Sequence, residues 1–310
     1  MAGLNLRAWS QAFQADKKGS GATRHAGSQT IKNFDNFVKE RKWKDVRPET
    51  LSSRQVRSYV LHRLGEKVNP RTVQNEVSHL RRIAAGAGQN LGDIREPKSD
   101  WSAARLGLPD RIERATNKPS ISASQFEKRA DLKPEIRVVL ELESALGLRA
   151  REAVLCPRSL NEWSEKLSAA RDDENLRLTV VHGTKGGRPR DVFIQPDRRD
   201  EALQIVEQAR EIVQKNIEKS GEAFLVIARP DADVQGVEGA LKKVENAVRH
   251  RGFTGSNSQH GIRRDFAQKN YHFYREEGLS EEDAMLRASM DLGHGRTDII
   301  PGHYLNGGQG

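Results

Sequence analysis

A set of side chains near the C-terminal end of the chain could attack a phosphodiester. His260 and Arg263 stand in His-Gly-Ile-Arg, and His294 follows in Leu-Gly-His. Tyr304 comes last, ten residues after that histidine. Arginine and histidine donate hydrogen bonds to phosphate oxygens, and a tyrosyl oxygen can carry a phosphoryl group covalently. Because residues three positions apart share one face of a helix, His260 and Arg263 are expected to lie together.

Two segments further upstream could complete such a site. Arg149 and Glu152 have the Arg-x-x-Glu spacing of one helical face, so the carboxylate could hold still a guanidinium that binds two phosphate oxygens. A surface ion pair is the alternative explanation of that spacing. Lys185 lies in Gly-Thr-Lys-Gly-Gly, where a lysine beside a leaving alkoxide is a usable general acid. Arg188 and Arg190 are alternatives to Lys185, and a basic turn without catalytic function is another.

Taken in this order, these patches resemble the active-site set of the tyrosine recombinases, the phage-integrase family. The resemblance implies that Arg149 and Arg263 bind the scissile phosphate and that His294 donates a further hydrogen bond. It implies that Tyr304 attacks the phosphorus and forms a 3′-phosphotyrosine, while Lys185 protonates the departing 5′ oxygen. Such transition-state electrostatics from preorganised donors is a large catalytic contribution.

The resemblance assigns supporting roles to two further residues. His260 is expected to handle the proton of the tyrosine, and Glu152 to brace the site. The chain departs from the family at two points. Arg264 stands where the family often has a histidine, and the interval from the last histidine to the tyrosine is 10 residues (304 − 294), one more than usual. A Pro-Gly pair within that interval breaks a helix and can absorb the extra residue.

The resemblance also implies the partners. We expect double-stranded DNA attachment sites and a homotetramer on two duplexes, assembled from monomers or dimers, with an accessory directionality factor as a further candidate partner. Neither a metal nor a cofactor is expected. The biological outcome would be integration or excision of a mobile element. Two alternatives remain open: a DNA-relaxing enzyme similar to type IB topoisomerases, and a non-catalytic helical DNA-binding regulator.

Composition agrees with a nucleic-acid partner. The 310 residues contain 52 Lys and Arg against 43 Asp and Glu, giving a net charge of +9 and a pI near 9.7. Such an excess favours a polyanion. The single cysteine, Cys156, excludes an internal disulfide and a cysteine-based metal cluster, and its apolar neighbours predict a buried thiol. With neither a membrane-length apolar run nor a signal-peptide core, we expect a cytoplasmic bacterial protein that joins the nucleoid when it acts.

The elements that must position these residues are mainly α-helical. We expect a helical N-terminal core-binding (SAM-like) domain over 1–110, a linker over 111–121, and a mostly helical α/β catalytic domain with a small antiparallel hairpin over 122–310. From about residue 89 to 120, Gly and Pro loosen the pattern around one short helix. Strands are predicted at 176–181 and 191–194. Helices are predicted around Ile31–Val38, from Ser52 or Ser53, from Pro70, from Ser122 or Ser124, and over 134–155, 199–218, 236–249, 259–276 and 280–291.

Basic residues recur on the polar faces of these helices and in the predicted turn. Their one-sided charge suits the DNA backbone, which sets affinity without reading sequence. The candidate DNA-binding residues are Arg54, Arg57, Arg71, Arg81, Arg82, Arg188, Arg190 and Arg264.

Overall fold

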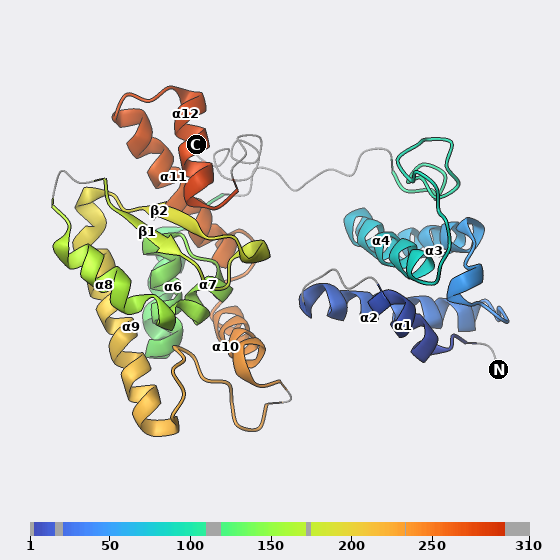
Figure 1. Ribbon diagram of the computed structural model, residues 1–310, viewed down its shortest axis with the longest axis horizontal. Helices are drawn as coiled ribbons and strands as arrows, with labels where there is room; N and C mark the ends of the chain where they lie inside the picture. The colour runs from blue at the N-terminus through green and yellow to red at the C-terminus, as the bar shows by residue number, and fades with distance from the viewer. Residues whose placement is uncertain (1–2, 16–20, 110–118, 172–174, 233, 295–310) are drawn as a thin grey trace. The chain divides into compact units, whose positions relative to one another are not determined.

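A computed structural model describes residues 3–15, 21–109, 119–171, 175–232 and 234–294 (Figure 1). The chain divides into two compact units, Met1–Arg114 and Ala115–Gly310. This division falls within the predicted linker, of which 110–118 lie outside the described residues. The fold is mainly helical with one small antiparallel sheet, as predicted.

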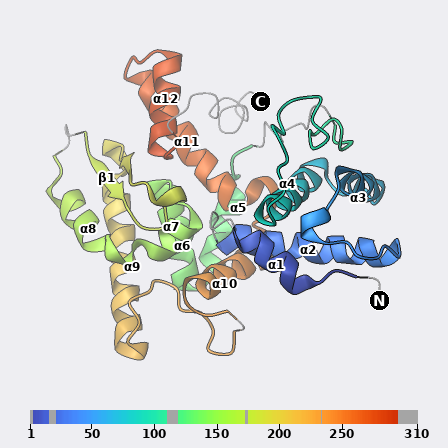
Figure 2. The ribbon, with the colours of Figure 1, turned by 45° about the vertical axis from the view of Figure 1, so that its right-hand side comes forward.

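Within residues 3–109, as far as they are described, the N-terminal unit forms a bundle of four α-helices, in which α1 packs on α2 and α4 (Figure 2). Ser52 caps α3 by accepting a hydrogen bond from the backbone N–H of Gln55, and Pro70 occupies the first position of α4. Both predicted helix starts are therefore confirmed. Aromatic side chains fill the core, with Phe34, Phe37 and Tyr59 buried against one another. The helices are α1 (Leu6–Ala15), α2 (Gly21–Glu40), α3 (Ser53–Gly65) and α4 (Pro70–Gly86).

A buried carboxylate ties three of these helices together. Glu76 on α4 is 5% exposed. It accepts hydrogen bonds from Tyr59 Oη at 3.0 Å and Arg63 Nε at 3.1 Å on α3, and from Asn33 Nδ2 at 3.0 Å on α2. Because all its donors come from other helices, this carboxylate fixes how the bundle is arranged.

Replacing Glu76 with glutamine is expected to lower the free energy of unfolding by about 2 kcal/mol, because the amide cannot accept from every donor and leaves buried groups unsatisfied. Chemical denaturation of the full chain measures this change. Glu49→Gln, at an exposed position of the same unit, is the control and should change it little. Equal unfolding curves for Glu76→Gln and the wild type would contradict the prediction.

Residues 89–109 belong to the N-terminal unit. Trp101, Leu106 and Leu108 are buried in its core. Over 89–109 the chain forms turns, in which the side chains of Asn90 and Asp93 accept hydrogen bonds from backbone N–H groups two residues on. The short helix predicted within 89–120 is absent from 89–109, and 110–118 lie outside the described residues.

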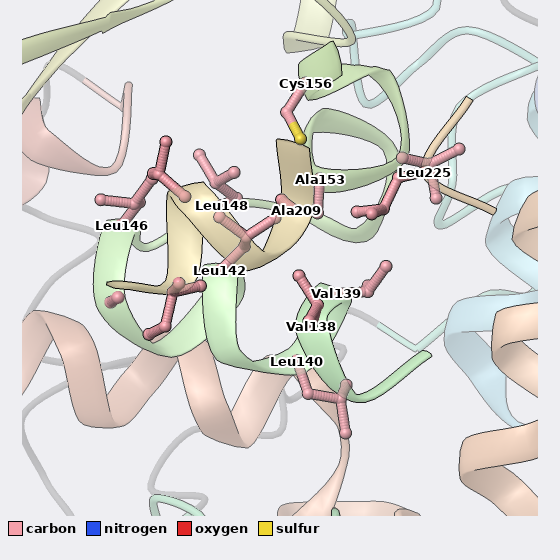
Figure 3. Packing of buried hydrophobic residues seen from close by; sticks show 14 of the residues in the cluster. Val138, Val139, Leu140, Leu142, Leu146, Leu148, Ala153, Cys156, Ala209 and Leu225 are labelled. Atoms are coloured by element: carbon pink, nitrogen blue, oxygen red, sulfur yellow. The ribbon is translucent and has the colours of Figure 1, made fainter. Parts of the chain in front are cut away.

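The C-terminal unit surrounds helix α6, which packs against α9 and α11 (Figure 1). Figure 3 shows Leu142 and Leu146 of α6 beside Leu148 and Ala209 in its core. Cys156 is buried at the edge of this cluster, so the predicted buried thiol is confirmed, and burial raises its pKa. The helices are α5 (Ala123–Glu127), α6 (Pro134–Leu146), α7 (Ala150–Leu155), α8 (Leu160–Ala169), α9 (Arg199–Ser220), α10 (Gly236–His250), α11 (Gln259–Glu276) and α12 (Glu281–Asp291).

The predicted hairpin is present. Strand β1 (Arg177–Val180) pairs antiparallel with β2 (Arg190–Phe193), from Arg177 opposite Phe193 to Val180 opposite Arg190. The turn between them contains the short 3-10 segment Lys185–Gly187. Strand β2 contacts α12, which in turn packs on α11 (Figure 1). Within the described ranges, no helix combines the length and apolar character needed to cross a membrane.

The single helix predicted over 134–155 is instead two helices. Gly147 ends α6 in the left-handed conformation, with φ of 55°. A Cβ added at this position would lie 2.5 Å from the ring of Phe266 on α11, so the break also permits the close approach of that helix. The break places Arg149 at the N-cap of α7, outside any regular helix.

The end of the predicted linker is part of the C-terminal unit. The backbone N–H of Ile121 donates to the carbonyl of Gly261 at 3.2 Å, and Ser120 donates to Gln268 on α11. Arg264 donates from Nε to the carbonyl of Pro119 at 3.0 Å and is only 7% exposed. The linker prediction was therefore wrong for 119–121. Arg264 therefore packs against protein backbone and, contrary to expectation, is not exposed on a DNA-binding surface.

Candidate active site

Three predicted catalytic residues line one cleft of about 1370 Å³ in the C-terminal unit. Arg149 comes from the start of α7, Lys185 from the turn of the hairpin, and His294 from the segment after α12. The lining is strongly cationic, with six Arg or Lys against two Asp: Arg149, Arg177, Lys185, Arg188, Arg190 and Arg287 against Asp191 and Asp283. Such a cleft attracts an anion.

Arg149 donates hydrogen bonds to the carboxylate of Glu152, the contact that the Arg-x-x-Glu spacing predicts. Its Nη1 donates to Glu152 Oε1 at 2.7 Å, and its backbone N–H donates to Glu152 Oε2 at 2.8 Å. Its Nη2 donates to the carbonyl of Leu292 at 3.3 Å. The pair spans the N-cap and first turn of α7, where the carboxylate also stabilises the helix start.

Glu152 has no exposed side-chain surface and faces three guanidinium groups. Besides Arg149, it accepts from Arg190 Nη2 at 2.7 Å and lies 3.8 Å from Arg263 Nη1. Burial alone would raise the pKa of Glu152, but Arg190 and Arg263 outweigh burial and hold that pKa below its ordinary value. The side chain is therefore an ionised brace at neutral pH.

Arg263 joins this cluster from α11. Its guanidinium is 3% exposed and donates to the carbonyls of Gly147 and Leu292. The carbonyl of Leu292 therefore accepts from both Arg149 and Arg263. The structure thus brings together two arginines separated by more than a hundred positions in the sequence, at a carbonyl two residues before His294.

Arg190 is a brace and not an exposed basic residue. Its side chain is 4% exposed and donates to the carboxylate of Glu152, to the carbonyl of Gly147 at 2.9 Å, and to the carbonyl of Asp291. Because its side chain is buried, Arg190 is neither the surface DNA contact nor the substitute for Lys185 that was expected. Gly293 makes the packing possible, because a Cβ there would lie 2.6 Å from Arg190 Cδ.

Lys185 and Arg188, in contrast, are both exposed in the hairpin turn and line the cleft. Glycines on both sides of Lys185 have positive φ, 77° at Gly183 and 76° at Gly186. A Cβ at Gly183 would lie 2.7 Å from the backbone oxygen of Arg151, so this turn packs directly on α7.

His294 is half-buried at the edge of the arginine cluster, and its backbone N–H donates to the carbonyl of Ser289 at 3.0 Å. Burial, together with the charges of Arg263, Arg149 and Lys185, lowers the pKa of His294 to about 4. The imidazole is therefore neutral at pH 7 and can donate one N–H to a phosphate oxygen.

We expect NMR titration of the free protein to show His294 titrating near pH 4, with the signal assigned by a His294→Gln variant. Because the pKa in the folded chain lies below its ordinary value of 6.5, this residue destabilises the fold progressively as pH falls from 6.5 towards 4. Binding of orthovanadate should raise the pKa, since an anion offsets the arginine charges. A midpoint at 6.5 without ligand would contradict the prediction.

Two catalytic candidates remain, His260 and Tyr304. His260 is the second residue of α11 and is exposed, whereas Arg263 is buried. His260 is not part of the lining of the described cleft. The expectation that these two side chains lie together stays a prediction. Tyr304 lies outside the described residues.

Sequence reasoning missed one buried residue behind the cleft. Asp291, at the end of α12, has no exposed side-chain surface. Its Oδ2 accepts from Asn270 Nδ2 at 2.9 Å and Tyr274 Oη at 2.8 Å on α11, and its Oδ1 accepts from Arg177 Nη1 at 3.2 Å on β1. The sequence contained one indication of this residue. Asp291 lies on the same buried face of α12 as Ala284 and Ala288, and a buried charge needs a partner because an unpaired one is costly.

The candidate DNA-binding residues of the N-terminal unit fall into two groups. Arg54, Arg57 and Arg71 are exposed. Arg81 and Arg82 are half-buried and make contacts within the unit, Arg81 with the carbonyl of Trp101 and Arg82 with the ring of Phe13, 4.5 Å from its centroid. For this second pair, contact with DNA stays a prediction.

A helical N-terminal unit is followed by a mostly helical unit whose cleft of arginines, lysine and histidine suits the phosphates of a nucleic acid. The sequence matches the family model described as "Integrase" over residues 112–269 and the model described as "Phage integrase, N-terminal" over residues 5–91. The chain belongs to this integrase family, the tyrosine recombinases, and its activity is site-specific breakage and rejoining of DNA.

Solved structures share the fold. A lambda integrase dimer bound to a COC′ core site is 13% identical, with a TM-score of 0.53 over 100% of this chain and 80% of that chain. The XerH recombinase bound to a palindromic difH substrate is 13% identical, with a TM-score of 0.52 over 95% of this chain and 90% of that chain. A comparison with curated protein sequences finds no match.

Proposed function

We propose that the cleft binds one scissile phosphate of duplex DNA and that Tyr304 attacks it. Arg149 and Arg263 neutralise the charge that grows on the non-bridging oxygens, and His294 donates one hydrogen bond. The observation that carries this proposal is that both guanidiniums donate to the carbonyl of Leu292, two residues before His294. The donors are therefore preorganised around one point before substrate binds.

Attack by the tyrosyl oxygen forms a bond to phosphorus and breaks the bond to the 5′ oxygen. Lys185, in the exposed hairpin turn, donates the proton that the departing 5′ oxygen needs, and His260 accepts the proton of Tyr304. The product is a 3′-phosphotyrosine that conserves the energy of the phosphodiester. A 5′-hydroxyl from a second duplex can therefore reverse the step and join new strands without metal or cofactor.

Strand exchange between two duplexes requires four cleavages, so we propose that four copies of the chain assemble on two attachment sites. Lambda integrase and XerH, which share the fold, were each solved on a DNA core site or substrate. A mobile element with two ends is the substrate that fits this reaction. Exposed Arg54, Arg57 and Arg71 would hold the duplex through its phosphates.

The test is covalent trapping on a pool of nicked duplexes with a randomised core sequence. A nick beside the cleavage point lets the short 5′ strand diffuse away, so the adduct accumulates. We expect adducts that survive detergent, recovered DNA with a common core sequence, and a phosphopeptide that contains Tyr304. If no adduct forms with any sequence while the chain still binds duplex DNA, the chain is a non-catalytic binder and the proposal fails.

A second assay separates recombination from relaxation. Two plasmids that carry the recovered core sequence should yield joined products of defined length. Relaxed plasmid without joined product would instead show an enzyme similar to type IB topoisomerases.

A further inference from the structure

One cation of the cleft, Arg177, has no part in the proposed chemistry and is held in place by an ion pair. Arg177 opens strand β1, and its side chain is 30% exposed and lines the cleft together with Lys185 and His294. The strand alternates, with Leu178 and Val180 buried on the opposite face. The pleat of the sheet therefore directs Arg177 away from the core.

Two neighbours hold this guanidinium in place. Its Nη1 donates to the buried carboxylate of Asp291 at 3.2 Å, and its charge lies 5.7 Å from the ring centroid of Phe193, its partner across the hairpin. Asp291 is itself fixed by Asn270 and Tyr274 of α11. Because a guanidinium has five donors in a rigid fork, one that is held through Nη1 is preorganised to bind an anion as well.

The place of Arg177 differs from that of the catalytic arginines. Arg149 and Arg263 meet at the carbonyl of Leu292, and Arg190 lies against their shared carboxylate. Arg190 pairs with Val180, at the other end of the hairpin ladder from Arg177. The two ends of the ladder are three residue steps apart, about 10 Å along the backbone. Arg177 is held by the side chain of Asp291, whereas Arg149 and Arg263 are held at the carbonyl of Leu292, so we assign Arg177 a phosphate other than the scissile one.

We propose that Arg177 binds a second backbone phosphate of the DNA, and that Asp291 and Phe193 hold its side chain toward the cleft for this purpose. This inference rests on the proposed function, because it needs duplex DNA in the cleft. Arg177 acts in binding and in setting the register of the DNA; Asp291 is a positioning residue that acts through Arg177.

Arg129 offers a closely matched control. It is 29% exposed, donates from Nε to Glu141 at 3.2 Å, and lies over the ring of Phe126 at 4.1 Å. It thus has the same kind of ion pair and ring contact as Arg177, but it does not line the cleft. Comparing the two arginines separates a DNA contact from an internal ion pair.

The experiment measures binding of the full chain to a duplex of arbitrary sequence at several salt concentrations. Loss of one phosphate contact lowers the slope of log affinity against log salt by about 0.9. We expect this change for Arg177→Gln and no change for Arg129→Gln. If Arg177→Gln keeps the slope of the wild type, the proposal is overturned.

A measurement on the wild-type chain avoids any effect of substitution on folding. Phenylglyoxal modifies accessible guanidiniums, and mass spectrometry reports each site. We expect duplex DNA to protect Arg177 and not Arg129; equal modification of Arg177 with and without DNA would overturn the proposal. The covalent trapping experiment is independent of both results, so failure at Arg177 leaves the proposed recombinase chemistry standing, whereas absence of any adduct rejects that chemistry.

Discussion

A Tyr304→Phe variant is expected to form no covalent adduct with nicked duplexes, with cleavage falling by about 10⁴-fold or more, as when an enzyme loses its nucleophile. Phenylalanine keeps the ring and removes only the oxygen that would attack phosphorus. Duplex binding should stay at the wild-type level, because that affinity comes from the arginines and lysines of the cleft. Gel analysis of detergent-treated reactions measures the adduct, and a filter-binding assay measures affinity.

Tyr271→Phe is the matched control. Tyr271 is a half-buried tyrosine of α11, and it is not part of the cleft lining. Its loss should leave adduct formation unchanged. Adduct formation by Tyr304→Phe at the wild-type rate would assign the nucleophile to another residue and contradict the proposed chemistry.

Replacing Glu152 with alanine is expected to lower the free energy of unfolding by about 3–5 kcal/mol, because it leaves buried guanidiniums without their carboxylate. Arg149, Arg190 and Arg263 all face this side chain. Cleavage should fall by about 100-fold at a temperature where the variant is folded, because misplaced donors no longer meet the transition state. Denaturation curves and adduct rates measure the two effects.

Glu141→Ala provides the comparison for that variant. Glu141 is a carboxylate of α6 that pairs with Arg129 and Arg137 and is 15% exposed. Its removal should cost less stability, since its partners remain partly in water, and it should not change the cleavage rate of the folded protein. The bracing role of Glu152 would be rejected if both variants cleaved DNA at the wild-type rate.

Much of the fold could be predicted because helix boundaries depend on local chemistry. Ser52 caps α3 through a neighbour three residues away, and Pro70 begins α4 because its fixed φ suits a first turn. The start of α11 at 259 and its end at 276 were also predicted correctly. The break at Gly147 was missed, because the apolar pattern continues through 134–155 and the reason for the break lies on α11.

The site was predicted less completely than the fold. The types and order of its residues pointed to Arg149, Lys185, Arg263 and His294, and three of these line one cleft while Arg263 lies directly behind it. Surface exposure could not be predicted in the same way. A basic residue on the polar face of a predicted helix is expected to be exposed to solvent. Arg264 is instead buried and donates to the carbonyl of Pro119, 145 residues away.

By itself, the sequence indicated the class of chemistry and where many of the helices begin and end, because both follow from residue type and short-range spacing. Only the tertiary structure decided which cations face the cleft and which lie inside. Arg190 became an internal brace because Asp291, 101 residues away, and Glu152, 38 residues away, take up its donors. Burial of a charge depends on partners that folding brings from distant segments, and spacing along the chain does not encode them locally.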